Sequence, residues 1–440
     1  MNRSLTIIAT AFCLASMLPA SSTAQVSPSF YDFVRGDLKW STLETPHFRV
    51  HFHSSADGPT SERSARIVAS IAEEIYGPIT ELYAHEPDAK VSIVLRDFED
   101  YSNGAAYFFD NVIQLWSPAL NTPFRGRHNW LRNVVTHEFT HIVQVGAAMK
   151  STRRVPFYYF QMLTYEDVRR PDVLYGYPDG IVTYPIPVVN NPAWLAEGTA
   201  QYQRTGMSFD TWDSHRDMLL RTRVLADEML SLADMGGFYS HNSLERETVY
   251  NQGFAFTQYL AGRYGEQALR DLTLSLGSWK SWNFQRAARK ALGENGRSIY
   301  EDWKEDLSSG YAEATSKVRT DPVAGRLLQG EGFLNRHPAF SPEGDRYGYV
   351  SNRGRDFSQT GLYVVDSNGH EELVLKGEGL LEDPFTYTCA LGHRVASRAF
   401  GSFSWSPDGG SIVYSRRRDN AKGYYFADLY EYELESRTEK

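Results

Sequence analysis

Residues 129–148 carry the pattern that most constrains how this chain can fold, His137-Glu138-Phe139-Thr140-His141. Side chains four residues apart lie one turn above each other on a helix, so both imidazoles can reach one metal ion from the same side. The apolar residues around the motif recur at three- and four-residue spacing, and Gly146 helps to close the segment: Leu131, Val134, Val135, Ile142 and Val143. The sequence therefore predicts a helix that presents His137 and His141 to one zinc ion.

The residue between the two histidines has a chemical use beside such an ion. Zinc lowers the pKa of a bound water towards neutrality, and the Glu138 carboxylate can then take the proton from that water. The alternative is an ordinary helix with two histidines and a solvated glutamate. The motif alone leaves both interpretations open, and a third ligand is needed to decide between them.

The third ligand is expected in residues 191–200, which read NPAWLAEGTA. Asn191 can cap a helix and Pro192 suits its first turn, which places Glu197 about a turn and a half into that helix. Gly198 would let the helix pack closely against a neighbour. The alternative for Glu197 is a surface helix glutamate.

Trp194, Glu197, Gly198 and Ala200 resemble the W-x-x-E-G-x-A signature of the gluzincin metallopeptidases, in particular the peptidase MA-like group. The resemblance runs from about residue 31 to residue 311. It implies a thermolysin-like zincin domain with a mixed sheet and helices, in which His137, His141 and Glu197 hold one zinc ion. In the gluzincins nearest to thermolysin an aspartate four residues after the ligand glutamate orients a histidine. Gln201 stands there in this chain, which puts that role in doubt.

The first 24 residues have the character of a secretory signal peptide, with Arg3, an apolar run over residues 5–18 and Ser22-Thr23-Ala24 before Gln25. The mature protein is expected to be exported, to the periplasm or outside the cell, with no transmembrane segment after signal removal. Cys389 is then the single remaining cysteine, so no intrachain disulfide is expected.

At 440 residues the chain is too long for one ordinary domain. We expect a metallopeptidase domain over residues 25–320 and β-propeller repeats over residues 321–440. The net charge of −9 is mild and spread along the sequence without a basic block, which argues against nucleic acid as a partner.

Three segments before the zinc motif have clear periodicity. Residues 47–53 alternate strictly and predict a half-buried strand whose other face carries three histidines. These could form a second metal site or be solvated, and the lack of an interleaved carboxylate favours solvated side chains. Residues 61–84 predict a helix with an apolar stripe, and residues 91–95 predict a buried strand.

Residues 107–109 and 112–116 flank Asp110-Asn111, which predicts a hairpin with a two-residue turn. In gluzincins the strand just before the zinc helix forms the rim of the cleft and pairs with the substrate backbone. Residues 112–116 occupy that place, with an internal strand as the alternative. Aminopeptidases of this superfamily carry a G-x-M-E-N motif here, whose glutamate holds the free amino terminus. Gly104-Ala105-Ala106 lacks that glutamate, which favours an endopeptidase or oligopeptidase.

Two further regions are relevant to a cleft. Residues 150–190 form an insertion rich in aromatics and proline that could be a lid, a membrane-touching flap or a cover for apolar surface. Residues 243–264 predict a helix ended by Gly265, and Tyr250-Asn251-Gln252-Gly253 within it resembles the tyrosine-bearing helix of the MA-like group. The resemblance implies that Tyr250 donates a hydrogen bond to the oxyanion, with His241 as the substitute. Core packing is the alternative for Tyr250. Helices are also expected at residues 266–276 and 299–317.

From about residue 321 the pattern changes to short strands. Ser341-Pro342-Glu343-Gly344 and Ser406-Pro407-Asp408-Gly409 each lead into a strand, at residues 347–351 and 412–415, and a second strand follows at residues 362–365 and 429–432. These units resemble the blades of TolB-like propellers, with an insertion near residues 378–399. A propeller needs about four blades to close, and two are recognisable, so the chain is expected to be the front part of a longer protein.

Two classes of function remain open. The first is an exported zinc metallopeptidase acting on peptide or protein substrates, with Glu138 as general base and the propeller as a binding or gating module. The second is a non-catalytic envelope scaffold with a vestigial zinc site and a propeller that binds a protein partner. A structural zinc site normally has four protein ligands. Three ligands are evident and Glu138 is present, which favours the enzyme.

Overall fold

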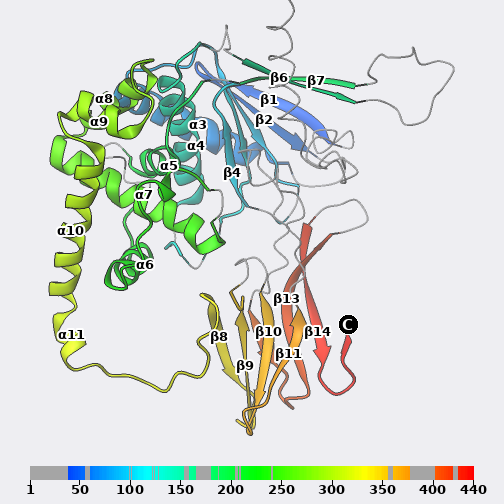
Figure 1. Cartoon of the computed structure of the whole chain (residues 1–440). Helices are drawn as coiled ribbons and strands as arrows, with labels where there is room; N and C mark the ends of the chain where they lie inside the picture. The colour runs from blue at the N-terminus through cyan, green and yellow to red at the C-terminus, as the bar shows by residue number, and fades with distance from the viewer. Residues whose placement is uncertain are drawn as a thin grey trace, which may run out of the picture.

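The computed structural model describes residues 38–54, 60–98, 100, 102–120, 122, 124–126, 128–152, 158–164, 180–186, 188–203, 207, 210–238, 241–354, 360–376, 402–419 and 425–440. The chain is of mixed α+β class (Figure 1). A helical domain with one mixed sheet is followed by two antiparallel sheets. The expected signal peptide, the 378–399 insertion and most of the 150–190 insertion lie outside the described residues.

The sheet of the first domain has five strands in the order β1-β2-β3-β5-β4. Strands β2, β3 and β5 run parallel, and β1 and β4 are antiparallel at the two edges. The strands are β1 (Lys39–Glu44), β2 (Phe48–Ser54), β3 (Val91–Leu95), β4 (Gly104–Tyr107) and β5 (Val112–Leu115). Helices α3 (Glu62–Tyr83) and α4 (Trp130–Ala147) pack against each other, and α4 also contacts β4 and β5.

The remaining helices of the first domain surround this pair. They are α5 (Ala193–Gln201), α6 (Ser214–Leu225), the short 3₁₀ helix η1 (Asp234–Gly236), α7 (Ser243–Tyr264), α8 (Gln267–Gly277), α9 (Phe284–Leu292), α10 (Gly296–Ala314) and α11 (Ser316–Thr320). One apolar core, from Phe48 to Trp303, joins the sheet and these helices. A separate hairpin, β6 (Tyr158–Thr164) and β7 (Gly180–Ile186), projects from this domain (Figure 1).

Two four-stranded antiparallel sheets form the second part of the chain. The first, in the order β11-β10-β9-β8, contains β8 (Asn335–Phe340), β9 (Arg346–Ser351), β10 (Gly361–Asp366) and β11 (Glu371–Lys376). The second contains β12 (Phe403–Trp405), β13 (Ser411–Asp419), β14 (Tyr425–Glu433) and β15 (Thr438–Glu439). A core of its own joins them, with Val350 and Leu362 from the first sheet and Ile412 and Tyr414 from the second. Within the described residues the two sheets form no closed ring.

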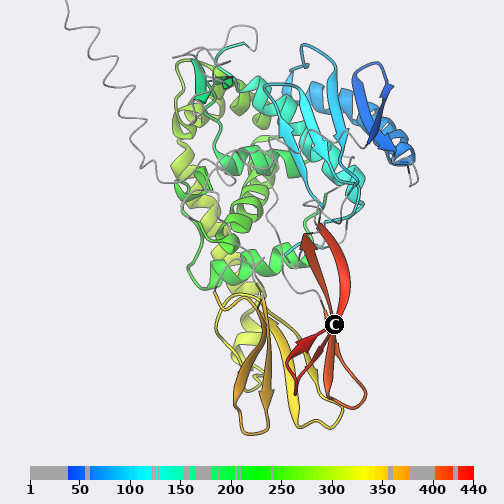
Figure 2. The ribbon, with the colours of Figure 1, turned by 90° about the vertical axis from the view of Figure 1, so that its right-hand side faces the viewer.

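The two parts of the chain also touch each other. The long β13–β14 hairpin reaches from the second sheet to the first domain (Figure 2), where the Ala427 N–H donates to Asp100 Oδ2 at 2.9 Å. The covalent connection runs through α11 and residues 321–328, which are exposed and lack regular structure. Among the described residues, no helix combines the length and the apolar character needed to cross a bilayer.

Most elements expected from periodicity are confirmed, including the strand at residues 91–95 and the helix at residues 243–264 with Gly265 at its end. The hairpin before α4 is confirmed, but the prediction of a two-residue turn is wrong. Tyr107 pairs with Val112, so four residues form the loop, and Asn111 adopts a left-handed conformation with φ 54°.

One of the three histidines at residues 47–53 differs from the expectation of a solvated face, whereas His47 and His51 remain partly exposed. His53 is 4% exposed and packs against Trp40 and Phe98. His47 stacks on Tyr76 and pairs with Glu73 at 2.7 Å. The alternating pattern does not predict that aromatic neighbours bury His53. The described residues form no second metal cluster here.

Candidate metal centre

Helix α4 places the two motif histidines side by side, as their spacing predicts. The helix starts at a cap, where Asn129 Oδ1 accepts from the Arg132 N–H at 3.4 Å. The His137 and His141 rings lie 4.7 Å apart at 86° to each other, and their Nε2 atoms are 3.1 Å apart. Both side chains are mostly buried, with 13% and 14% exposure. Two nitrogens thus converge on one point.

Glu197 supplies the third converging atom from α5. Its Oε2 lies 3.2 Å from His137 Nε2 and 3.3 Å from His141 Nε2. Pro192 occupies the cap position of α5, so the predicted helix is confirmed, although the Asn191 side chain pairs with Gln144 at 2.8 Å instead of capping the helix. Among the described residues, His137, His141 and Glu197 are the one group of three side chains arranged to hold a metal ion.

The three donor atoms fit a tetrahedral ion. Ligands at the usual zinc distances are separated from one another by about 3.3 Å in a tetrahedral arrangement, and the three separations here are 3.1, 3.2 and 3.3 Å. Glu197 Oε2 is buried and makes no hydrogen bond of good geometry despite its two close neighbours. Buried polar oxygens normally have a partner, and a cation at the centre of the triangle would provide it.

The charges of the triad act on one another. Burial alone would raise the pKa of Glu197, but His141 and His137 outweigh it and hold the pKa of that carboxyl well below its ordinary range. Burial lowers the pKa of His141, and the Glu197 carboxylate beside it raises that pKa above its ordinary value. The site is thus an anionic carboxylate between two imidazoles, a donor set that suits zinc.

Glu138 lies between α4 and the edge of the sheet. Its side chain is 6% exposed, and burial raises its pKa, against the opposite effects of His137 and His141. The strand that it faces is β4, where a Cβ on Gly104 would lie 2.6 Å from Glu138 Oε1 and 2.5 Å from Val134 Cγ2. Glycine at position 104 therefore makes room for the carboxylate.

The edge strand of the sheet is β4, not the strand at residues 112–116. That segment, β5, pairs with β3 on one side and β4 on the other, so its backbone groups are used inside the sheet. Of the two alternatives for residues 112–116, the internal strand is confirmed, because the preceding strand folds back and takes the outer position. Gly104-Ala105-Ala106 lies on this outer strand.

Two glycines bring α5 and α7 into direct contact. A Cβ on Gly198 would overlap Thr257 Oγ1 and the Gly253 carbonyl, and a Cβ on Gly253 would lie 2.5 Å from the Trp194 carbonyl oxygen. The close packing expected of Gly198 is confirmed, and its partner is the glycine of the Tyr250-Asn251-Gln252-Gly253 segment. This contact fixes α5, and therefore Glu197, against the helix that carries Tyr250.

Tyr250 is close to the triad. Burial raises the pKa of its phenol well above the ordinary value, and the Glu197 and Glu138 carboxylates add to the effect. The ring stacks on Phe238 at 5.5 Å, and the Arg125 guanidinium lies 4.9 Å from its centroid. His241, the expected substitute, instead donates from Nε2 to the Asp234 carbonyl at 2.8 Å and faces η1.

Arg125 is a residue of the site that the sequence did not reveal. Its guanidinium makes two parallel hydrogen bonds to Glu247, of 2.8 and 2.9 Å. Burial lowers the pKa of Arg125, but Glu247 raises that pKa above its ordinary value. The pair therefore holds a fixed cation against the Tyr250 ring. Arg125 and Glu247 are 122 residues apart and belong to no recognisable motif, so no local signal could have found them.

Gln201 does not orient a histidine. With its amide assigned so that both ends are satisfied, Gln201 donates to the Tyr250 carbonyl at 2.9 Å and accepts from Arg216 Nη1 at 2.8 Å. Arg216 is itself buried against Asp210 at 3.0 Å. The residue that replaces the expected aspartate therefore links α5 to α6 and α7.

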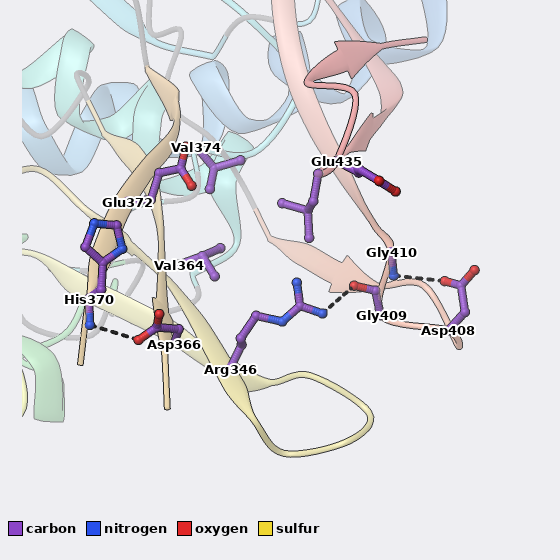
Figure 3. Close-up of a pocket in the computed structure, with 11 residues that line it drawn as sticks. Arg346, Val364, Asp366, His370, Glu372, Val374, Asp408, Gly409, Gly410 and Glu435 are labelled. Carbon is purple, nitrogen blue, oxygen red and sulfur yellow. Dashed lines mark hydrogen bonds between the residues drawn. The ribbon is translucent and has the colours of Figure 1, made fainter. Parts of the chain in front are cut away.

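A separate hollow lies between the two sheets of the second part and has a volume of about 430 Å³. Figure 3 shows its polar lining, in which Arg346 donates to the Gly409 carbonyl and Asp366 accepts from the His370 N–H. Asp408 accepts from the Gly410 N–H at 3.0 Å. These groups serve the local turns, and no three ligand atoms among the described residues converge here. Among the described residues, the group that could hold a metal ion is the triad.

Comparison with known proteins adds little. No family model matches the chain, and no curated protein matches it. Among solved structures, the chain is similar to TolB from Acinetobacter baumannii, with 21% identity, a TM-score of 0.19 and coverage of 28% of this chain. The match spans about a quarter of the TolB chain, 24%. A similarity of this extent assigns neither fold nor function.

Proposed function

We propose that this protein is an exported zinc metallopeptidase of the gluzincin type, which hydrolyses internal peptide bonds. The single observation that carries the proposal is the triangle of His137, His141 and Glu197, whose donor atoms lie 3.1–3.3 Å apart. Three protein ligands leave a coordination position for water or substrate, as in catalytic zinc sites.

The residues around the triad have the arrangement that hydrolysis requires. Zinc bound there would supply a Lewis acid that lowers the pKa of a water molecule. Glu138, nearly buried beside the ligands, would accept the proton from that water and return it to the leaving amine. Tyr250, held by Phe238 and Arg125, would donate a hydrogen bond where negative charge develops on the carbonyl oxygen.

The sheet edge supports cleavage within a chain. Strand β4 is the last strand of the sheet, and its Gly104 lies directly against Glu138. An extended peptide pairing with β4 would pass the catalytic carboxylate and be held mainly by main-chain hydrogen bonds, which select little for sequence. An endopeptidase or oligopeptidase acting on unfolded chains fits this edge.

The test compares hydrolysis of an unfolded protein by the purified chain and by Glu138→Gln, with bound zinc quantified in both. We expect Glu138→Gln to keep zinc and to lose at least about 100-fold in kcat. Glu197→Ala removes a ligand. It should therefore lower zinc affinity by more than the roughly 10- to 100-fold that is typical when a residue hydrogen-bonded to a ligand is mutated. Glu305→Gln, at an exposed position of α10, serves as the matched control.

The possible outcomes distinguish a peptidase from a zinc-containing scaffold. Cleavage by the parent and by Glu305→Gln, but not by Glu138→Gln at equal zinc content, supports the peptidase. Absence of cleavage by all three, with zinc present, would contradict the peptidase and favour a zinc-containing scaffold whose propeller binds a partner. Full zinc occupancy in Glu197→Ala would show that the third ligand is wrong.

A further inference from the structure

Two tryptophans stand half exposed on the loop between α8 and α9. Trp279 is 47% exposed and Trp282 is 48% exposed, and their rings meet edge to face with centroids 5.6 Å apart. By contrast, Trp116, Trp194 and Trp303 are at most 2% exposed. A contiguous aromatic patch in water is costly, and it commonly marks an interaction site.

The loop that carries them is held in place from inside the protein. Lys150 is 7% exposed, and its Nζ donates to the carbonyls of Leu276, Ser278 and Ser281 at 2.5, 2.7 and 2.8 Å. The same Nζ lies 4.9 Å from the Trp282 ring centroid. Three hydrogen bonds from a buried ammonium fix both the end of α8 and the loop, so the two indoles are presented on a rigid support.

Positive charge follows these indoles closely in the chain, on the exposed side of α9. Arg286, Arg289 and Lys290 recur at three- and four-residue spacing on α9, opposite the buried Ala287 and Ala288. Lys280 adds a fourth cation between the two tryptophans. The sequence has no acidic residue between Asp271 and Glu294, and Glu294 is engaged by Arg263 and Tyr264. Within the described residues, none of these four cations has a carboxylate partner.

We propose that this face docks on an anionic phospholipid bilayer. It is defined by Trp279, Lys280, Trp282, Arg286, Arg289 and Lys290, and is called the Trp-Arg face below. A local cluster of four cations without carboxylate partners, on a protein of net charge −9, attracts an anionic surface. Paired indoles beside it suit the headgroup region, where one side of the ring is wet and the other apolar.

The position of the Trp-Arg face agrees with peripheral docking. Helices α8 and α9 lie at the opposite end of the molecule from the two blade sheets (Figures 1 and 2), so binding there leaves the blades clear of the surface. Nucleic acid or an anionic polysaccharide would use the cations without burying the indoles in an apolar layer. The inference does not depend on the proposed peptidase activity.

The experiment is flotation of the purified full chain with vesicles of phosphatidylcholine alone or mixed equally with phosphatidylglycerol, with tryptophan emission followed in parallel. We expect binding to the anionic vesicles only, a blue shift of the emission and quenching by brominated lipid. Arg286→Glu/Arg289→Glu/Lys290→Glu should reduce partitioning by at least about 100-fold at low salt. Trp279→Ser/Trp282→Ser should reduce it by roughly 10-fold and abolish the shift.

Two control variants remove cations or an indole from outside the Trp-Arg face. Lys317→Glu/Arg319→Glu/Arg326→Glu removes three exposed cations from α11 and the segment after it, and Trp40→Ser removes an indole that is 39% exposed. Both should bind vesicles as the parent does. Equal losses in test and control variants, or binding without blue shift or quenching, would overturn the proposal. Quenching of the parent needs no variant, so a folding defect cannot obscure the result.

Discussion

At the scale of single residues, the geometry of the candidate site also depends on residues outside its three candidate ligands. Gly104 is the clearest case, because a Cβ there would overlap both Val134 Cγ2 and Glu138 Oε1. The overlap involves the carboxylate that the proposed reaction uses, so a methyl group at this position would displace the base without touching a ligand.

Gly104→Ala should therefore keep zinc and lose at least about 10-fold in kcat, because a displaced carboxylate is a poorly positioned base. Enzyme assay and zinc analysis of the purified variant check this. Adding Val134→Ala removes the second overlap, so Gly104→Ala/Val134→Ala should regain stability but not turnover. Recovery of turnover in the double variant would show that the effect comes from general packing and not from Glu138.

Tyr250 can be tested by removing its hydroxyl alone. Tyr250→Phe keeps the ring between Phe238 and Arg125 but loses the proposed donor, and such donors are typically worth about 100- to 1,000-fold in kcat. We expect a fall of that order with KM and zinc content little changed. Tyr259→Phe, on the same helix with its hydroxyl on Arg263, is the control. Unchanged kcat in Tyr250→Phe would assign the tyrosine to packing.

Some residues of the candidate site can be predicted from the sequence, and others cannot. His137, Glu138 and His141 are predictable because one helix fixes their relative positions, and Glu197 follows from a second local motif. The Gly104–Glu138 contact, the Arg125–Glu247 pair and the partners of Gln201 join distant segments. No local pattern encodes such contacts, because they exist only after the helices and the sheet have packed.

At the scale of elements, the packing of α5 on α7 sets the position of Glu197, the proposed third ligand. Gly253 allows the approach, and the atoms its Cβ would meet belong to the Trp194 backbone, which cannot rotate away. Any enlargement at this position must move α5 as a unit, and Glu197 moves with it.

Gly253→Ala should lower the free energy of unfolding by roughly 1–3 kcal/mol through overpacking, and it should also weaken zinc binding. Gly262→Ala lies on the same helix with nothing within 4 Å of the added Cβ, and should stabilise by up to about 1 kcal/mol through helix propensity. Thermal unfolding and zinc titration of both variants test this. Similar behaviour of the two would show that the α5–α7 contact is not tight.

Some elements have too few large apolar residues to be predicted from the sequence. β1 is a polar edge strand, and five of its six residues are exposed, so its sequence has no apolar alternation. Helix α9 is amphipathic, but it is only nine residues long and its buried side has one large apolar residue, Phe284, beside Ala287 and Ala288. The order of β4 and β5 was also missed, because a hairpin sequence does not say which of its strands lies at the edge.

At the scale of the whole molecule, the separate cores define two units. One core extends from Phe48 to Trp303, and a second joins the two antiparallel sheets from Val350 to Tyr414. Between them, residues 321–328 are exposed, with Val323 and Leu327 largely in water. The contact between Asp100 and Ala427 is a single hydrogen bond at an exposed site, worth about 1 kcal/mol or less.

Because each unit has its own core, brief trypsin treatment should cut first after Arg326, in the exposed segment, and then after Lys317 and Arg319 in the short helix α11. It should release a first domain that keeps the proposed zinc ion. Exposed chain without regular structure is the preferred site of proteolysis. Mass spectrometry of the fragments and zinc analysis of the isolated domain measure this, and Lys317→Gln/Arg319→Gln/Arg326→Gln should abolish the early cut. Loss of zinc on cleavage would mean that the two antiparallel sheets stabilise the candidate metal site, and the contact between the β13–β14 hairpin and Asp100 would then be the route.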